Sequence, residues 1–246
     1  MSPLGQIKIV LVEPAGALNV GSVARVMKNM GLGQLVLVNP ECDPLGEQAR
    51  LMAVHAVEIL ETAEVVPDLA TALMGCSRIM ATVGRDMDTN IPLAPPRQTL
   101  PALLNHSAAI IFGREDHGLT NQELMLAQCL IQIPTDSTYP SLNLAQAVGV
   151  CCYELWQAQA DQSALGGEQS SQSPSTASFE DLEGFYGHWQ SLLLKIGYLY
   201  PHTADSRMAK LRGLVNRSQP TAAEIALLRG MLRQVFWAIE HLPSQR

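Results

Sequence analysis

The sequence predicts an α/β fold, in which a parallel sheet has helices on both faces, followed by a small all-helical extension. Within residues 1–159, short apolar runs rich in branched side chains alternate with segments of helical period, and this strand–helix–strand order implies a parallel sheet. Residues 160–178 are rich in serine and glycine and cannot build a core, so we interpret them as a flexible linker. Only helical patterns follow, in an extension that spans residues 179–246.

The elements of the first domain can be taken in order along the chain. Ile7 to Val12 is a near-continuous apolar run, typical of a buried strand, and Asn19 is a suitable cap for the helix that follows it. Thr120 is a suitable cap for a later helix that begins at Asn121. The predicted strands are 7–12, 35–38, 78–83, 108–112 and 130–133, and the predicted helices include 19–30, 47–60, 68–74, 100–105 and 143–159.

The extension contains three predicted helices, at 179–196, 207–215 and 221–239. The first has a stripe of large apolar side chains, which we expect to pack within a small bundle or against a partner subunit. The stripe consists of Leu182, Phe185, Tyr186, Trp189 and Leu193.

Composition excludes several classes of protein. No apolar run among the 246 residues is long enough to span a membrane, and the start of the chain lacks the basic region of a signal peptide. The five cysteines form no C-x-x-C pair, and the six histidines show no ligand spacing, so we expect no metal site. An odd number of cysteines without metal spacing suggests reduced thiols and a cytoplasmic location.

The charge of the chain is unevenly distributed. The net charge is −7, and residues 1–162 alone hold 8 Lys and Arg against 16 Asp and Glu, a net charge of −8. Residues 207–233 hold six basic side chains and one acidic one, a net charge of +5. This basic window is either a solvated helical face or a face that binds phosphates.

Polar loops follow two of the predicted strands at the point where each strand ends. Gly113 ends one strand, and a charged triplet at 114–116 then leads to Gly118; Pro140 and Ser141 follow the other strand and open a helix with free N–H groups. Each loop alone could be no more than a turn or a helix cap. Because ligands bind at the carboxyl ends of parallel strands, two such loops in one chain favour a ligand site.

The common nucleotide-binding and hydrolase motifs are absent. No G-x-G-x-x-G follows the first strand, and the stretch from Gly16 to Gly21 has the wrong spacing for it. The chain also lacks the P-loop motif and a nucleophile elbow with a Ser-His-Asp order.

Three segments resemble, in order and spacing, the signature motifs of the SPOUT-superfamily RNA 2′-O-ribose methyltransferases. They are Asn19-x-Gly-Ser-Val-Ala-Arg25, Phe112-Gly-Arg-Glu-x-x-Gly-Leu119 and Tyr139-Pro-Ser-Leu-Asn-Leu-Ala145. Within that superfamily, residues 181–188 and 227–232 resemble the helical extension of the TrmJ type, whose members methylate tRNA in the anticodon loop. The resemblance covers nearly the whole chain and is weakest in the linker and around residues 86–96.

The resemblance implies a trefoil knot in the C-terminal part of the α/β domain, a homodimer, and S-adenosylmethionine as cofactor. The implied substrate is tRNA, with ribose methylation expected at nucleotide 32 on cytidine, uridine or both. The motifs leave two alternatives open: the same chemistry on ribosomal RNA, and an RNA-binding module that no longer transfers methyl groups.

The cofactor is implied to lie bent among three loops, with its adenine on apolar side chains while backbone groups read the edges of the ring. On this chain the implied cofactor-binding residues are Thr82, Val83, Gly84, Gly113, Glu115, Gly118, Leu119, Ile133, Pro140, Ser141 and Leu142.

Arg25 is the implied catalytic residue, assisted by Asn19, Glu115, Ser141 and Asn143. An arginine base is chemically awkward, because the pKa of its guanidinium exceeds about 12. We therefore favour a role in which Arg25 orients the ribose hydroxyl and stabilises the developing alkoxide, although its action as a base stays open.

Six basic residues are candidates for RNA binding. Arg85 follows the first cofactor loop, and Arg114 either holds an RNA phosphate or fixes Glu115. The TrmJ type usually has a second arginine two residues after the position of Arg85. Met87 stands there, which weakens a phosphate clamp at this place. The candidates in the extension are Arg207, Lys210, Arg212 and Arg217.

Overall fold

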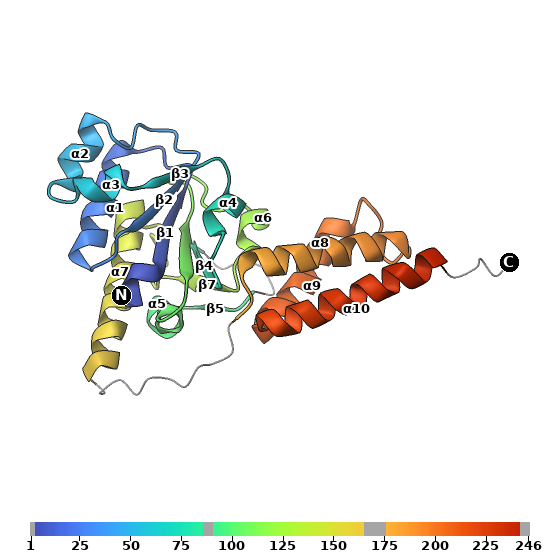
Figure 1. Ribbon diagram of the computed structural model, residues 1–246. Helices are drawn as coiled ribbons and strands as arrows, with labels where there is room; N and C mark the ends of the chain where they lie inside the picture. Colours follow the sequence, from blue (N-terminus) through green and yellow to red (C-terminus); the bar gives the residue numbers. More distant parts are fainter. Residues whose placement is uncertain (1–2, 86–90, 165–175, 242–246) are drawn as a thin grey trace. The chain divides into compact units, whose positions relative to one another are not determined.

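The computed structural model describes residues 3–85, 91–164 and 176–241 of the chain (Figure 1). The chain divides into two compact units, residues 1–170 and residues 171–246. We call them the α/β unit and the helical unit.

The α/β unit is built on a sheet of seven strands that are all parallel, in the order β3-β2-β1-β6-β4-β7-β5. Every predicted strand is confirmed, with shifts of at most one residue at the ends. Two further strands are too short for an apolar pattern to reveal them. The strands are β1 Ile7–Val12, β2 Gln34–Val38, β3 Glu64–Val66, β4 Arg78–Val83, β5 Leu93–Ala94, β6 Ala108–Phe112 and β7 Cys129–Gln132.

Strand β6 lies at the centre of this sheet and is buried along its whole length. It pairs with β1, where Leu11 lies beside Phe112, and with β4, where Ala81 lies beside Ile111. Figure 1 shows α1 and α7 on one side of the sheet and α4 and α6 on the other. Covered on both faces, the central strands read as continuous apolar runs, which is why the sequence located them so closely.

The helices of the α/β unit differ from the sequence pattern mainly in one break. The predicted helix 47–60 is wrong in one respect: Val54 has a φ of +55° and separates two short helices. Both halves present apolar residues to the same core, so the pattern runs through the break. The helices are α1 Ala17–Asn29, α2 Glu47–Ala53, α3 Val57–Glu61, α4 Leu69–Leu73, α5 Pro96–Thr99, α6 Asn121–Leu124 and α7 Leu144–Ala164, with 3-10 turns at Pro3–Gln6 and Leu100–Leu103.

The predicted linker is partly structured at both ends. Helix α7 continues to Ala164, and Thr176 forms an antiparallel bridge with Thr221 in the helical unit. Residues 165–175 of the predicted linker lie outside the described residues. The trefoil knot implied by the resemblance stays a prediction.

The helical unit consists of α8 Phe179–Lys195, α9 Ala204–Ser218 and α10 Ala222–His241. The apolar stripe of α8 packs within this unit, as one of the two sequence-based alternatives proposed, against Met208 and Ile225 among others. The hydroxyl of Tyr186 donates a hydrogen bond of 2.7 Å to Oδ1 of the buried Asn216, so the core contains a satisfied polar pair. None of the helices in the described part of the chain combines the length and apolar character needed to cross a membrane.

Candidate active site

One pocket opens where the neighbouring strands β6, β4 and β7 end. Ten of the eleven predicted cofactor-binding residues line it; the exception is Leu119, whose backbone lies behind Gly113. Arg114 and four apolar positions complete the lining and were not predicted as part of the cofactor site. The lining residues are Thr82, Val83, Gly84, Phe112, Gly113, Arg114, Glu115, Gly118, Ile131, Ile133, Pro140, Ser141, Leu142, Leu144 and Ala147.

Gly113 is required because two stretches of backbone meet at its α-carbon. A Cβ atom there would lie 2.3 Å from the carbonyl carbon of Gly118 and 2.5 Å from the amide nitrogen of Leu119. The loop closes on itself through two hydrogen bonds between the backbones of Arg114 and Gly118, and Gly118 has a φ of +72°. Any side chain at Gly113 would therefore force this loop open and change the wall of the pocket.

The three sequence motifs meet in a chain of side-chain hydrogen bonds beside this pocket. The amide nitrogen of Asn143 donates to the side-chain oxygen of Asn19 at 2.9 Å. The amide nitrogen of Asn19 donates in turn to Oε1 of Glu115 at 3.1 Å. Each of these three predicted catalytic residues comes from a different motif, so the motifs are joined directly.

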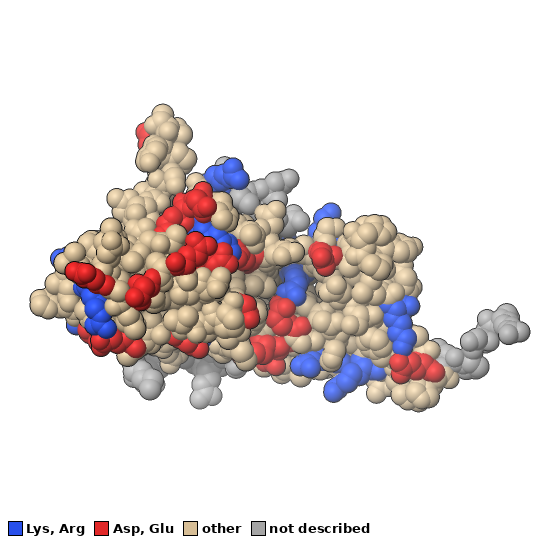
Figure 2. Space-filling view, turned by 90° about the horizontal axis from the view of Figure 1, so that it is seen from above, with Lys and Arg blue, Asp and Glu red and all other residues tan. Residues whose placement is uncertain are grey.

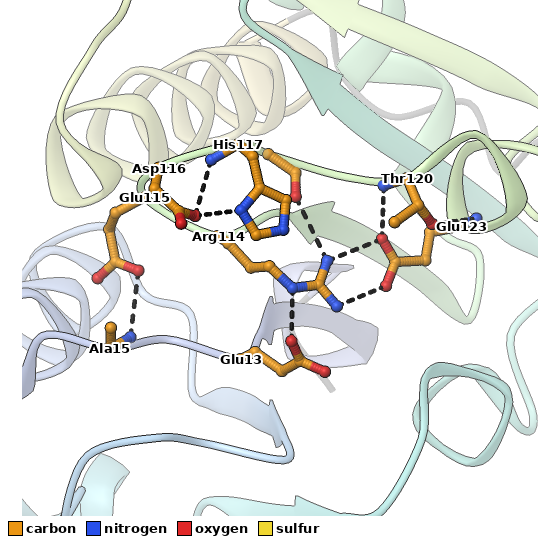
Figure 3. A network of polar contacts seen from close by, with 9 residues as sticks. Glu13, Ala15, Arg114, Glu115, Asp116, His117, Thr120 and Glu123 are labelled. Carbon is orange, nitrogen blue, oxygen red and sulfur yellow. Dashed lines mark hydrogen bonds and ion pairs between the residues drawn. The ribbon is translucent and has the colours of Figure 1, made fainter.

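Glu115 lies against the start of α1. Its two carboxylate oxygens accept hydrogen bonds of 3.1 Å from the backbone N–H groups of Ala15 and Gly16, the first of which is drawn in Figure 3. Burial raises the pKa of the Glu115 carboxyl, but the Asn19 amide and these backbone donors outweigh that effect and lower the pKa overall. Glu115 is therefore held as a carboxylate.

The prediction that Asn19 caps its helix is wrong. Helix α1 begins at Ala17, with Gly16 before it, and Asn19 lies inside the first turn, where its side chain binds Glu115 and Asn143. The first turn of α1 therefore uses Asn19 for tertiary contacts, while the carboxylate of Glu115 serves the free N–H groups just before it.

Helix α7 begins at Leu144, one residue after the predicted start. The side-chain oxygen of Asn143 accepts a hydrogen bond of 2.9 Å from the backbone N–H of Ala145, so Asn143, rather than Ser141, caps this helix. Asn143 thus uses its oxygen for the helix and its nitrogen for Asn19. Ser141 is exposed and lines the pocket.

Arg114 is held between two carboxylates, as Figure 3 shows. Its Nε donates to Glu13 at 2.5 Å, and its two terminal nitrogens donate to the oxygens of Glu123 at 3.0 and 3.1 Å. Only 13% of its side chain is exposed. The hydrogen bond to Glu13 and that to Glu123 raise the pKa of the Arg114 guanidinium further.

The proposed roles of Arg114 as an RNA ligand or as a support of Glu115 do not fit this geometry. Its guanidinium is committed to Glu13 and Glu123, which the sequence analysis missed as functional residues. A signal for Glu123 existed: it follows Thr120 by three residues, and the two form the capping box of α6. Glu13 directly follows β1 and offered no comparable local signal.

Arg25 lies apart from the pocket lining. Its side chain is exposed on α1 and makes no hydrogen bond or ion pair within the described residues. Arg85 is likewise exposed, directly after the loop at Gly84, whereas Met87 lies outside the described residues. Glu115 and Ser141 therefore line the pocket, and Asn19 and Asn143 are hydrogen-bonded beside it. Arg25, the fifth predicted catalytic residue, does not line the pocket.

Of the four candidate RNA-binding residues in the extension, Arg212 must be reassigned. Its guanidinium forms an ion pair with Glu183 and lies 4.4 Å from the centre of the Tyr186 ring, so it holds α8 and α9 together. Arg207, Lys210 and Arg217 are exposed. The sequence could not distinguish Arg212 from these three residues, because its partner Glu183 lies on another helix.

No group of three or more histidine, cysteine or acidic side chains within residues 3–85, 91–164 and 176–241 is arranged to hold a metal ion. All five cysteines are free thiols, and three of them are buried. Figure 2 shows large patches of acidic side chains on the displayed face of the α/β unit, in agreement with its negative net charge.

Comparison with known proteins extends over both units. Residues 6–153 match the SpoU rRNA Methylase family, and residues 180–243 match the family described as tRNA methyltransferase TrmJ, C-terminal domain. The chain is 40% identical to the tRNA (cytidine/uridine-2′-O-)-methyltransferase TrmJ of Cronobacter sakazakii over 240 residues, which cover 94% of this chain and 96% of that protein.

Two further similarities agree with this match. The tRNA (cytidine/uridine/adenosine-2′-O-)-methyltransferase TrmJ of Pseudomonas aeruginosa is 40% identical over 242 residues, which cover 94% of each chain. The crystal structure of TrmJ from Z. mobilis has a TM-score of 0.81 and 31% identity, and the match covers 93% of this chain and 98% of that one. The chain therefore belongs to the SpoU methylase family and, within it, to the TrmJ group.

Proposed function

We propose that this protein transfers the methyl group of S-adenosylmethionine to a ribose 2′-hydroxyl in the anticodon loop of tRNA, with nucleotide 32 as the expected site. The observation that carries this proposal is the hydrogen-bonded chain from Asn143 through Asn19 to Glu115 beside the pocket. It joins three segments far apart in the sequence at the edge where ligands of parallel sheets bind. Membership of the TrmJ group supports both the reaction and the substrate.

The residues of the pocket suit the proposed cofactor. Val83, Ile133 and Leu142 offer apolar surface for an adenine ring, and the backbone of the loop from Gly113 to Gly118 offers hydrogen-bonding groups. A Cβ atom on Gly84 would meet no atom within 4 Å, so this wall has room for a ligand. The ionised carboxylate of Glu115 faces a pocket expected to receive a cationic sulfonium compound.

When bound, S-adenosylmethionine supplies a methyl group on a positively charged sulfur, which an oxygen nucleophile can displace. The residues of this chain then have to position the ribose hydroxyl. Asn19 and Asn143 hold each other and Glu115 in fixed orientation, so the polar edge of the pocket is organised before RNA binds.

In the proposed mechanism the guanidinium of Arg25 donates hydrogen bonds to the ribose oxygen and stabilises its developing negative charge. A guanidinium is a donor only, so the proton of the 2′-hydroxyl would pass to an RNA phosphate oxygen or to water, while the displaced sulfur would leave as a neutral thioether. Since Arg25 does not line the pocket of its own chain, we propose that the enzyme is a homodimer in which Arg25 of one chain serves the pocket of the other.

RNA binding is assigned to exposed basic side chains that form no ion pair with another described residue. Residues 1–162 have a net charge of −8, so the polyanionic tRNA needs positive charge from elsewhere. Arg85 and the exposed residues Arg207, Lys210 and Arg217 are the proposed contacts. The domain roles, the homodimer and a cytoplasmic location are parts of this proposal.

The proposal is tested in two steps. Calorimetric titration with S-adenosylmethionine should give one site per chain, and a chain that does not bind it would instead be a non-catalytic RNA-binding module. Mass mapping of tRNA from a deletion strain should then show the loss of one 2′-O-methyl group in the anticodon loop. Loss of a methyl group from ribosomal RNA, with tRNA unchanged, would contradict the proposed substrate.

A further inference from the structure

A short loop between α8 and α9 carries three exposed aromatic rings. Tyr198 and Tyr200 are 55% and 54% exposed, and His202 is exposed as well. Between the two tyrosines, Leu199 is only 1% exposed and packs into the core of the helical unit. We call residues 196–203 the aromatic loop. Exposed tyrosines in such a group are unusual, because large aromatic rings normally gain free energy by burial.

The backbone of the aromatic loop is well anchored. Gly197 has a φ of +75°, and the N–H groups of Tyr198 and Leu199 donate to the carbonyl oxygen of Leu193 at 2.9 and 3.0 Å. The N–H of Thr203 donates to the carbonyl oxygen of Tyr200 at 2.9 Å. With Leu199 buried between them, Tyr198 and Tyr200 are held outward, so their exposure is built into the loop.

Positive charge lies directly beside these rings. The guanidinium of Arg207 lies 5.8 Å from the centre of the Tyr198 ring and donates a hydrogen bond of 2.9 Å to the Tyr198 carbonyl oxygen. Lys210 and Arg217 follow Arg207 by three and ten residues, which places all three within about 80° of one another around α9 at about 100° per residue. Asp205, the acidic residue of α9, lies about 160° away from Arg207 on the same count.

We propose that the aromatic loop is a base-stacking site, in which Tyr198 and Tyr200 stack on unpaired bases of the RNA substrate. This inference rests on the proposed function and adds a contact that phosphate binding alone does not provide. An exposed aromatic ring beside cationic side chains is the arrangement that single-stranded RNA requires, because bases bind to rings while phosphates bind to charges. An anticodon loop offers such unpaired bases, whereas a paired stem does not.

The surface could instead bind protein, for example a second copy of the chain. The adjoining charges favour RNA, because the α9 face with Arg207, Lys210 and Arg217 has no acidic partner among the described residues. A self-complementary contact between two copies would bring these positive charges together, which costs free energy.

The test uses the full chain without S-adenosylmethionine and a stem-loop RNA that carries 2-aminopurine in its unpaired loop. Binding should quench the 2-aminopurine fluorescence, since the base stacks on an aromatic ring. Tyr200→Ala, which leaves the contact between Tyr198 and Arg207 intact, should weaken RNA binding at least about fivefold, and the Tyr198→Ala/Tyr200→Ala variant should weaken it about 25-fold or more. Phenylalanine at both positions should keep the affinity within about twofold of the wild type.

Further variants distinguish base stacking from phosphate binding and from a general loss of exposed aromatic surface. The alanine variants should keep the wild-type slope of affinity on salt concentration, whereas Lys210→Ala/Arg217→Ala should reduce that slope and keep the fluorescence quenching. Trp237→Ala removes another exposed ring, 59% exposed on α10, and should leave binding within about twofold. Melting temperatures of all variants should stay close to the wild type, because the altered side chains are exposed.

The inference is overturned if the double alanine variant binds the stem-loop as tightly as the wild type. A change in the oligomeric state of that variant, measured by light scattering, would strengthen this conclusion. That outcome would assign the aromatic loop to a protein contact. Failure of the proposed function looks different: a chain that binds the stem-loop through its tyrosines but never transfers a methyl group keeps the stacking site and loses the enzymatic activity.

Discussion

The side-chain amide of Asn143 donates a hydrogen bond of 2.9 Å to the side-chain oxygen of Asn19, a residue 124 positions earlier in the chain. Asn19 in turn donates a hydrogen bond to Glu115, while the side-chain oxygen of Asn143 caps α7. One asparagine thus couples the start of a helix to the orientation of a carboxylate in another motif.

The two roles of Asn143 can be separated by substitution. Asn143→Ser keeps an oxygen that can cap α7 but has no amide to offer Asn19, so we expect stability close to the wild type and methyl transfer at least about tenfold slower. Asn143→Ala should also lose about 1 kcal/mol of stability, since it removes the cap. Single-turnover assays and thermal unfolding measure the two effects, and equal rates for Asn143→Ser and the wild type would refute the positioning role.

Arg25→Ala should abolish methyl transfer while the affinity for S-adenosylmethionine stays close to the wild type, because Arg25 does not line the pocket. Lys28→Ala removes another exposed cation of α1 and serves as the control. Single-turnover methylation and calorimetry measure the two quantities. If transfer by Arg25→Ala persisted within tenfold of the wild type, about 1.4 kcal/mol in the barrier, the catalytic role of Arg25 would be wrong.

A homodimer with shared sites predicts complementation between two inactive variants. Gly113→Ala should block the pocket, since a Cβ atom there would lie 2.3 Å from the Gly118 backbone. Arg25→Ala keeps the pocket but lacks the arginine. Mixed dimers would contain one site with both an intact pocket and an intact Arg25, so the mixture should regain activity that neither variant has alone. A monomer by light scattering that is fully active would disprove this arrangement.

The ion pairs of Arg114 predict a pH-dependent effect on stability. Arg114→Gln should lower the free energy of unfolding at pH 7 by roughly 1–3 kcal/mol, less than the loss of a fully buried pair because Glu13 is partly exposed. Arg114 lowers the pKa of the Glu13 carboxyl, and with the Thr120 contacts it outweighs the effect of burial on Glu123.

The sign of this pH dependence follows from the lowered pKa values. A carboxyl whose pKa is lowered by folding contributes stability above its unfolded pKa of about 4.3, and that contribution is lost as the pH falls through the folded value. The stability difference between wild type and Arg114→Gln should therefore shrink below about pH 4. Chemical denaturation between pH 7 and pH 3 measures it, and a difference that stays constant would contradict the role of the two carboxylates.

The reassigned Arg212 contrasts with two other basic residues of α9, Lys210 and Arg217. Lys210→Glu/Arg217→Glu should weaken tRNA binding and flatten its salt dependence by roughly 1.5 units, since each phosphate contact contributes roughly 0.7 to 0.9. Arg212→Ala should instead lower the melting temperature and leave the salt slope unchanged, because its partner is Glu183. A salt slope that changes with Arg212→Ala but not with Lys210→Glu/Arg217→Glu would reverse the assignment.

A chain ending at residue 170 should fold and bind cofactor but methylate tRNA poorly.

The α/β class, the central strands and most residues of the pocket could be predicted from the sequence alone. Strands β1, β4 and β6 begin and end at the predicted residues, because a strand buried on both faces has apolar residues at most positions. Gly113 follows β6 directly, and Pro140 lies in the loop after β7, so their place at one edge of the sheet follows from parallel pairing. Thr120 carried its own local signal as a helix cap.

Only the tertiary structure decided which partners the polar side chains have. Arg114 and Glu13 are 101 residues apart in the chain, and neither a periodicity nor a charge count reveals that they pair. The same holds for Arg212 with Glu183 and for Asn19 with Asn143. Apolar patterns report burial along one element, whereas a hydrogen bond depends on where two elements meet, and that is a property of the folded chain.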